Sequence, residues 1–147
     1  MPIESTSLSS PLIWLKNEID RTLGVARSGL AQAVNEPDSR PASLEACENQ
    51  VRQVRGSLIF MGLDGAARFC FAIESAVRRH AESGAKLNQI TASIVDRSMF
   101  ALSQYLDDIA KGEADVPLKL FPLHRELGEL SGRTEVLEIE LFYPDIS

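Results

Sequence analysis

The chain has 147 residues, of which 44% are hydrophobic and 24% are charged, and its formal net charge is −6. This length and balance fit one globular domain and exclude wholesale disorder. The acidic charge disfavours a broad basic surface for nucleic acid or anionic lipid. No apolar run approaches the roughly 18–20 residues that span a bilayer, and the N-terminus lacks the basic stretch of a signal peptide, so we expect a cytoplasmic domain.

Four long stretches repeat apolar residues every three or four positions, which is typical of helices with one buried face. In chain order they cover residues 10–34, 41–61, 63–83 and 88–110. Ser10 and Pro11 are expected to start the first helix as a cap and a first-turn proline, and Gly62 to end the second. The residues predicted to be buried are Leu12, Leu15, Ile19, Leu23, Ala26, Leu30 and Ala33, then Leu44, Cys47, Val51, Val54, Leu58 and Met61, then Leu63, Ala66, Cys70, Ile73 and Val77, and finally Leu87, Ile90, Ile94, Ala101, Leu102, Tyr105 and Ile109.

A shorter fifth helix is predicted within residues 117–130, beginning either at Pro117 or at Pro122. The tail that follows fits a helix or a strand, and its residues 141–143, Leu-Phe-Tyr, are expected to fold back onto the helices. Because short loops join the long helices, neighbouring helices must run antiparallel. The sequence therefore predicts an all-α fold: a single domain over residues 1–147, built as an antiparallel four-helix bundle with a short fifth helix and a C-terminal tail.

Residues that commonly carry catalysis or bind metals are few and scattered. His80 falls at a helix C-terminus, where a cation is favoured, and His124 is expected at the surface of the short helix. Neither has the i, i+4 partner of a helical metal site. Cys47 and Cys70 are expected to be buried about 10 Å apart along a helical hairpin, too far for a disulfide. We therefore expect no metal, no cofactor and no catalytic residue, and so no enzymatic activity in this domain.

Gly56 stands out because it falls in the middle of the second predicted helix. A glycine there costs about 1 kcal/mol relative to alanine, so either a tight helix crossing or a partner that approaches the backbone should offset it. Arg52 lies one turn earlier and could simply be a solvated cation paired with Glu48 at i−4. Alternatively, this part of the helix is an interaction face, made of Glu48, Arg52, Arg55, Gly56 and Ser57.

Residues 52–57, Arg-Gln-Val-Arg-Gly-Ser, with Gly62 after them, resemble the signature helix of histidine phosphotransfer (HPt) domains. In that signature a histidine is followed after two residues by Lys or Arg, Gly and Ser, and a second Gly comes six residues after the first. Arg52 stands at the phosphoacceptor position of the motif. A guanidinium is a permanent cation and cannot serve as a phospho-imidazole does. The resemblance thus implies an HPt-like bundle whose phosphoacceptor position is degenerate.

Further segments carry a second resemblance. They are Met-Gly-Leu-Asp-Gly-Ala-Ala-Arg-Phe at 61–69, Tyr-Leu at 105–106, the proline-containing run at 115–123, and Leu-Phe followed by Pro-Asp within 141–145. In this order they resemble the N-terminal region of the chemotaxis-type hybrid histidine kinases that control type IV pili and twitching motility (the ChpA/PilL type), and the related pilus regulator FimL. Members of that family are much longer, so the resemblance implies that the chain is an N-terminal fragment of a larger protein, a histidine kinase or a FimL-like regulator.

Together these features predict a non-catalytic protein-interaction domain in two-component, chemosensory control of type IV pili, cytoplasmic and recruited to the cell pole. The expected partners are a response-regulator receiver domain or a polar type IV pilus scaffold protein, with neither nucleic acid nor membrane insertion. Two alternatives remain. An active phosphotransfer domain would need His80 or His124 as its phosphoacceptor. A structural or oligomerisation module would cover a neighbouring chain with its apolar tail residues, which are Leu137, Ile139, Leu141, Phe142 and Tyr143.

Overall fold

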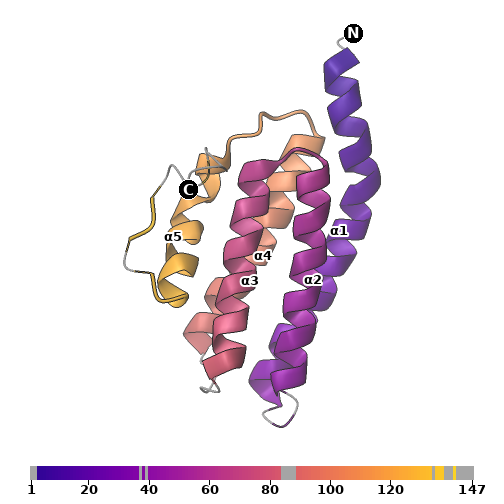
Figure 1. The fold of residues 1–147 in the computed structure, drawn as a ribbon. Coiled ribbons are helices and arrows are strands. Elements are labelled where there is room, and N and C mark those ends of the chain that lie inside the picture. Colours follow the sequence, from indigo (N-terminus) through magenta and orange to yellow (C-terminus); the bar gives the residue numbers. More distant parts are fainter. Residues whose placement is uncertain are drawn as a thin grey trace.

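The computed structural model describes residues 3–36, 38, 40–83, 89–133, 135–137 and 141. Its helices are, in chain order, α1 (Ile3–Asn35), α2 (Arg40–Phe60), α3 (Asp64–Ser83), α4 (Gln89–Ala110), the 3₁₀ helix η2 (Pro117–Leu120) and α5 (Phe121–Leu130). No strand occurs within the described ranges, so the predicted all-α fold is confirmed. The four long helices lie side by side, and the first turns of α1 project past the ends of the others (Figure 1).

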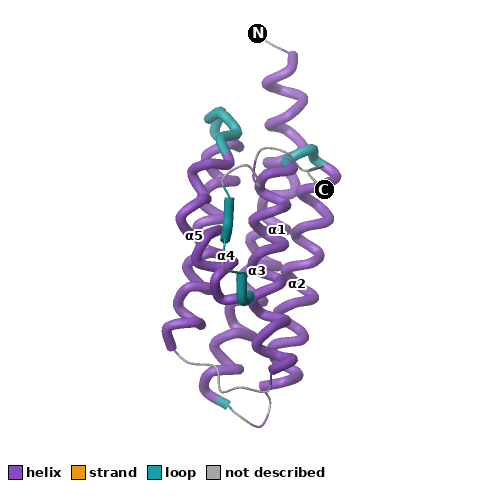
Figure 2. The backbone as a smooth tube through the Cα atoms, turned by 60° about the vertical axis from the view of Figure 1, so that its left-hand side comes forward, coloured by secondary structure: helices purple, strands orange, loops and turns teal. Residues whose placement is uncertain are grey.

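The long helices enclose one hydrophobic core. α1 packs against α2 and α4, and α3 packs against the same two helices, so the four form a closed ring. Successive long helices run in opposite directions, as Figures 1 and 2 show. α5 packs against α3 and α4, and η2 packs against α3, which adds a further layer on that side of the ring.

Most of the predicted apolar stripes are buried, because the three-and-four spacing puts each stripe on one side of its helix. Two of the predictions are wrong. α1 begins at Ile3, so Ser10 and Pro11 lie within it; a proline there costs one backbone hydrogen bond without ending the helix. Ile90 is 74% exposed, whereas the next residues along α4, Thr91 and Ala92, are buried, so the buried face is turned away from the predicted one at this end of the helix. Leu87 and the side chain of Leu12 lie outside what the structure describes.

A glycine turn joins α2 directly to α3. Gly62 has a φ of +76°, a left-handed conformation that favours glycine. Its N–H donates to Ile59 O over 3.0 Å, and the N–H of Leu63 donates to Leu58 O over 3.0 Å. These two bonds form a Schellman motif, which satisfies the last carbonyl groups of α2. The predicted cap is confirmed, and the turn sets which residues of α2 and α3 lie side by side.

Gly65, in the first turn of α3, is where distant segments meet. A Cβ atom at this position would contact the ring of Pro117 and would lie 2.9 Å from the carbonyl oxygen of Leu141. Leu141 is buried in the core, so the predicted fold-back of the tail is confirmed for this residue. Phe142 and Tyr143, predicted to join it, lie outside the described residues. The segments that contain Pro117 and Leu141 therefore both lie against the start of α3 here.

Candidate interaction site on α2 and α3

A buried carboxylate lies between α2 and α3. The side chain of Glu74, on α3, is only 1% exposed, and three guanidinium groups surround it. Arg52 donates from Nε to Oε1 over 3.0 Å, and Arg55 donates from Nε to Oε2 over 2.8 Å. Nη2 of Arg78, one turn further along α3, lies 3.5 Å from Oε1. A buried carboxylate is unfavourable unless it is paired, and these arginines supply the pairing.

Glu48 is a second carboxylate shared by two arginines. Its Oε2 atom accepts from Nη2 of Arg52 over 2.8 Å and from Nε of Arg78 over 2.7 Å. Arg52 also donates from Nη1 to Oδ1 of Asn49 over 3.2 Å. We refer to Glu48, Arg52, Arg55, Glu74 and Arg78 as the arginine cluster. Its three guanidinium groups face two carboxylates, which leaves one positive charge in excess.

The positions along each helix explain why the cluster forms. Glu48, Arg52 and Arg55 are spaced by four and three residues, so they share one side of α2. Sequence reasoning found only the Glu48–Arg52 pair and missed Glu74 and Arg78. The signal was nonetheless present, because Glu74 follows the buried Cys70 by four residues and therefore falls on the buried side of α3. The interpretation of Arg52 as a solvated cation paired only with Glu48 is therefore incomplete, because Arg52 also donates to Asn49 and Glu74.

Gly56 faces open space. A Cβ atom there would meet nothing within 4 Å, so the described residues form no tight helix crossing at this glycine. The close approach of α1 to α2 occurs instead at Gly29, where a Cβ atom would lie 3.4 Å from the carbonyl oxygen of Ser43. The second explanation, a partner that approaches the backbone, stays a prediction.

Gly56 lines a hollow between α1 and α2 of about 470 Å³, which we call the α1–α2 groove. Two aromatic side chains flank it, Trp14 at 79% exposed and Phe60 at 83% exposed. Single exposed apolar residues are ordinary, but two large aromatic groups on either side of an open glycine make a concave apolar surface. Such a surface can receive a protruding side chain.

The five residues of the predicted face have different surroundings. Glu48 is buried and serves as an acceptor within the cluster. Arg55 is partly buried, and its guanidinium lies 5.1 Å from the centre of the Phe71 ring. Ser57 donates from Oγ to the carbonyl oxygen of Gln53 over 3.4 Å. Arg52, whose side chain is 46% exposed, and Gly56 are the members that face solvent.

Neither histidine lies on α2. His80 is in the last turn of α3, with Nδ1 placed 3.1 Å from the carbonyl oxygen of Ala76. The prediction that His124 lies at the surface is wrong, because it is 4% exposed. His124 follows Leu120 by four residues and precedes Leu127 by three, which puts it on the side of α5 that packs against the core.

Both cysteines are buried and carry free thiols, as predicted. Cys70 donates from Sγ to the carbonyl oxygen of Val51 over 3.2 Å, which links α3 to α2. Burial, helped by the adjacent charge of Glu48, raises the pKa of the Cys47 thiol to about 12. Thiols in such an environment stay protonated at neutral pH and are poor nucleophiles.

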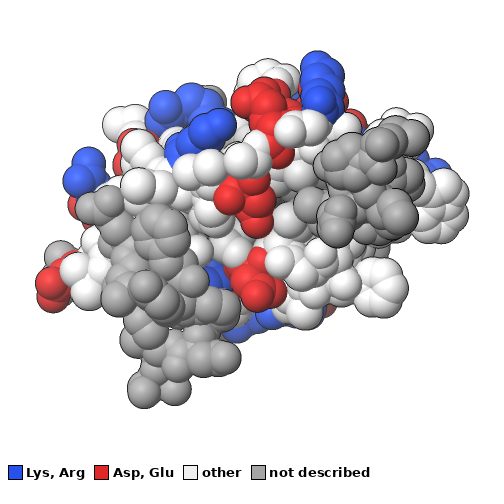
Figure 3. Space-filling view, turned by 90° about the horizontal axis from the view of Figure 1, so that it is seen from above, with Lys and Arg blue, Asp and Glu red and all other residues white. Residues whose placement is uncertain are grey.

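The charge pattern at the end of the molecule that carries the α2–α3 turn is mixed. Acidic side chains lie between basic ones across the described part of this face (Figure 3). Within the described ranges, no group of three His, Cys, Asp or Glu side chains could hold a metal ion. None of the helices found there combines the length and the apolar character needed to cross a membrane.

The fold and the site thus define an all-helical protein with a fixed cluster of arginines on one side and an open glycine beside it. Comparison of the chain with protein-family models, with curated proteins and with solved structures found no match.

Proposed function

We propose that the chain is an HPt-like four-helix domain that lacks a phosphoacceptor and binds a protein partner through the outer side of α2. The closed ring of four antiparallel helices and the position of the signature run next to the Gly62 turn support the HPt-like fold. The presence of Arg52 where the motif has its histidine supports a role in binding without phosphotransfer.

One observation carries this proposal: Gly56 is open to solvent one turn after an arginine that is already held in place. Three hydrogen bonds, to Glu48, Asn49 and Glu74, use three of the five N–H donors of Arg52, so two remain for an incoming acceptor. Because these bonds hold the guanidinium in position, less side-chain entropy is lost when a partner binds. The absent side chain at Gly56 lets a partner approach the helix backbone.

The partner and the pathway follow from the sequence resemblance. An acidic receiver domain of a response regulator would place carboxylates near Arg52, and a polar scaffold protein of the type IV pilus is the other candidate. In either case the domain would act in chemosensory control of pili as a docking module, at the cell pole. Its parent protein would be a histidine kinase or a FimL-like regulator.

A titration with matched glycine variants tests the proposal. Purified receiver domains from the source organism, and the pilus scaffold protein, would be titrated against the unmodified chain, Gly56→Leu and Gly24→Leu. Gly24 is the control, because it lies within a helix and a Cβ atom there also meets nothing within 4 Å. We expect binding to fall at least about tenfold for Gly56→Leu and to stay unchanged for Gly24→Leu. Equal affinity for all three proteins would place the interface elsewhere and refute the role of α2.

A further inference from the structure

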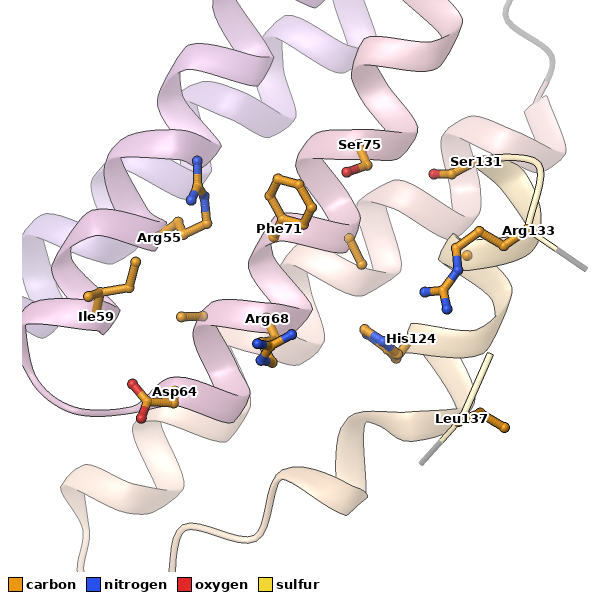
Figure 4. A pocket seen from close by; sticks show the side chains of 13 residues that line it. Arg55, Ile59, Asp64, Arg68, Phe71, Ser75, His124, Ser131, Arg133 and Leu137 are labelled. Carbon is orange, nitrogen blue, oxygen red and sulfur yellow. The ribbon is translucent and has the colours of Figure 1, made fainter. Parts of the chain in front are cut away.

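A second concave surface lies on the other side of the arginine cluster, between α3 and α5. It has a volume of about 710 Å³, and Leu137 of the tail forms part of its wall. We call it the α3–α5 groove. It shares no residue with the α1–α2 groove, and of the five residues of the predicted face only Arg55 lines it. Figure 4 shows Arg68 between Asp64 on one side and His124 on the other, with Phe71 further along α3 and Ser131 near the level of Ser75.

The groove is locally basic although the whole chain is acidic. Three arginines line it, Arg55, Arg68 and Arg133, against the single carboxylate of Asp64. Arg55 already donates to Glu74, and Arg133 donates from Nη2 to the carbonyl oxygen of Glu135 over 3.2 Å. Across the described residues, Arg68 has neither an ion pair nor a hydrogen bond. Its charge is therefore available to a ligand.

Two polar atoms in the groove are buried and find no hydrogen-bond partner among the described residues. One is Nε of Arg68, and the other is Oγ of Ser131, at the end of α5. A buried donor without an acceptor is costly in a native protein, and native structures contain few of them. Both atoms belong to side chains that line the same groove, so a ligand that carries hydrogen-bond acceptors could satisfy both.

The rest of the lining is largely apolar. Phe71, about half exposed, and Ile59 lie toward α2, and Leu137 lies on the side of the tail. A ligand that fits must therefore combine an anionic group with an apolar one. Several consecutive residues of a peptide meet both requirements, and the volume is within the range of sites that hold ligands of that size.

We propose that the α3–α5 groove binds an acidic segment of a partner protein, with one carboxylate paired to Arg68, a separate acceptor of the segment hydrogen-bonded to Ser131, and an apolar side chain of the segment placed against Phe71. Charge complementarity selects this occupant, because a planar guanidinium without a partner matches a carboxylate in a bidentate geometry. The site would give the domain a second point of attachment, independent of Arg52 and Gly56.

Fluorescence anisotropy with a labelled peptide of roughly ten residues, in which Asp and Glu alternate with Phe and Leu, tests the proposal. The control peptide replaces each acid by its amide. The protein variants are Arg68→Gln and, as the control, Arg125→Gln, which removes the same charge from an exposed position of α5 outside the groove. We expect the acidic peptide to bind and the amide peptide not to bind. Arg68→Gln should weaken binding of the acidic peptide about tenfold or more, whereas Arg125→Gln should change it less than about twofold.

Several results would overturn this assignment. They are no binding of the acidic peptide, equal binding of the amide peptide, and equal weakening by both variants, which would indicate general electrostatic attraction. Binding of 3-phenylpropionate as tight as that of the peptide would indicate a small-molecule site. Self-association that is lost in Arg68→Gln, seen by sedimentation, would make a second copy of the chain the occupant. If Arg68→Gln does not fold, the Nε–H signal of Arg68 in the unmodified protein decides: it must shift on titration with the acidic peptide and not with the amide peptide.

Discussion

Nε of Arg52 on α2 lies 3.0 Å from Oε1 of Glu74 on α3, although 22 positions separate the two residues in the chain. The tight turn at Gly62 folds α3 back along α2 and places the two side chains at the same level. Glu74 is almost fully buried, whereas Arg52 is half exposed, so the pair connects the core to the surface. The guanidinium of Arg52 is thus held in place at the surface by the carboxylate of Glu74, which solvent does not reach.

Glu74→Gln tests how much the arginine cluster contributes to stability. The substitution keeps the shape of the side chain but removes the charge that Arg52, Arg55 and Arg78 share. We expect the free energy of unfolding to fall by about 2–4 kcal/mol, because three guanidinium groups would lose a charged acceptor in a partly buried setting. Urea denaturation followed by circular dichroism measures the change. Glu18→Gln, which alters only an exposed pair with Arg21, should leave stability unchanged.

Gly56→Ala should stabilise the protein. Nothing lies within 4 Å of the added Cβ atom, and alanine is the better helix former, so we expect a gain of about 0.5–1 kcal/mol in the free energy of unfolding. The same change at Gly24 should have a similar effect, since its surroundings are equally open. Thermal and urea denaturation of both variants would check this. A loss of stability at Gly56 alone would mean that the glycine has a structural role after all.

Gly65→Ala should have the opposite effect. The added Cβ atom would collide with Pro117 and come within 2.9 Å of the carbonyl oxygen of Leu141. We expect the free energy of unfolding to fall by about 2 kcal/mol or more, because the backbones of η2 and the tail must move away from α3. Gly128→Ala provides a comparison, as its Cβ atom would lie 2.5 Å from Cγ2 of Val136, a side chain that can adjust more easily than backbone. A neutral Gly65→Ala variant would contradict the close contact.

Stability should fall as the pH rises above about 9 because the cysteine thiols are buried. The pKa of Cys47 is raised from an ordinary value of 9.0 to about 12 in the folded protein. Between these two values the unfolded state loses the proton and the folded state keeps it, so unfolding is favoured by up to about 1.4 kcal/mol per pH unit per thiol. Below pH 9 the thiol is protonated in both states, so its contribution to the free energy of unfolding is fully present.

Urea denaturation between pH 7 and 10.5 would measure this effect, with Cys47→Ala as the control. We expect the pH dependence to be shallower in the variant, since one of the two thiols is gone. Identical slopes for the two proteins would show that Cys47 does not contribute. A thiol reagent gives a second readout, because neither cysteine should react until the chain unfolds.

The helices and their buried faces could be predicted from the sequence because both depend on local spacing. Apolar residues three or four positions apart define one side of a helix, whatever it packs against, and Gly62 signals an end because its conformation is local. The same reasoning placed Cys47 and Cys70 in the core. It failed at Ser10 and Pro11, which look like a helix start but lie within α1, and at Ile90, where spacing alone did not decide exposure.

The sequence by itself thus determined the all-helical class and most of the core. Only the tertiary structure decided the partners of Arg52, the burial of His124 and the open space at Gly56. Each of these depends on which helices become neighbours and at what level along their axes. That choice is made by the turns and by the packing of the whole core, and no local pattern contains it.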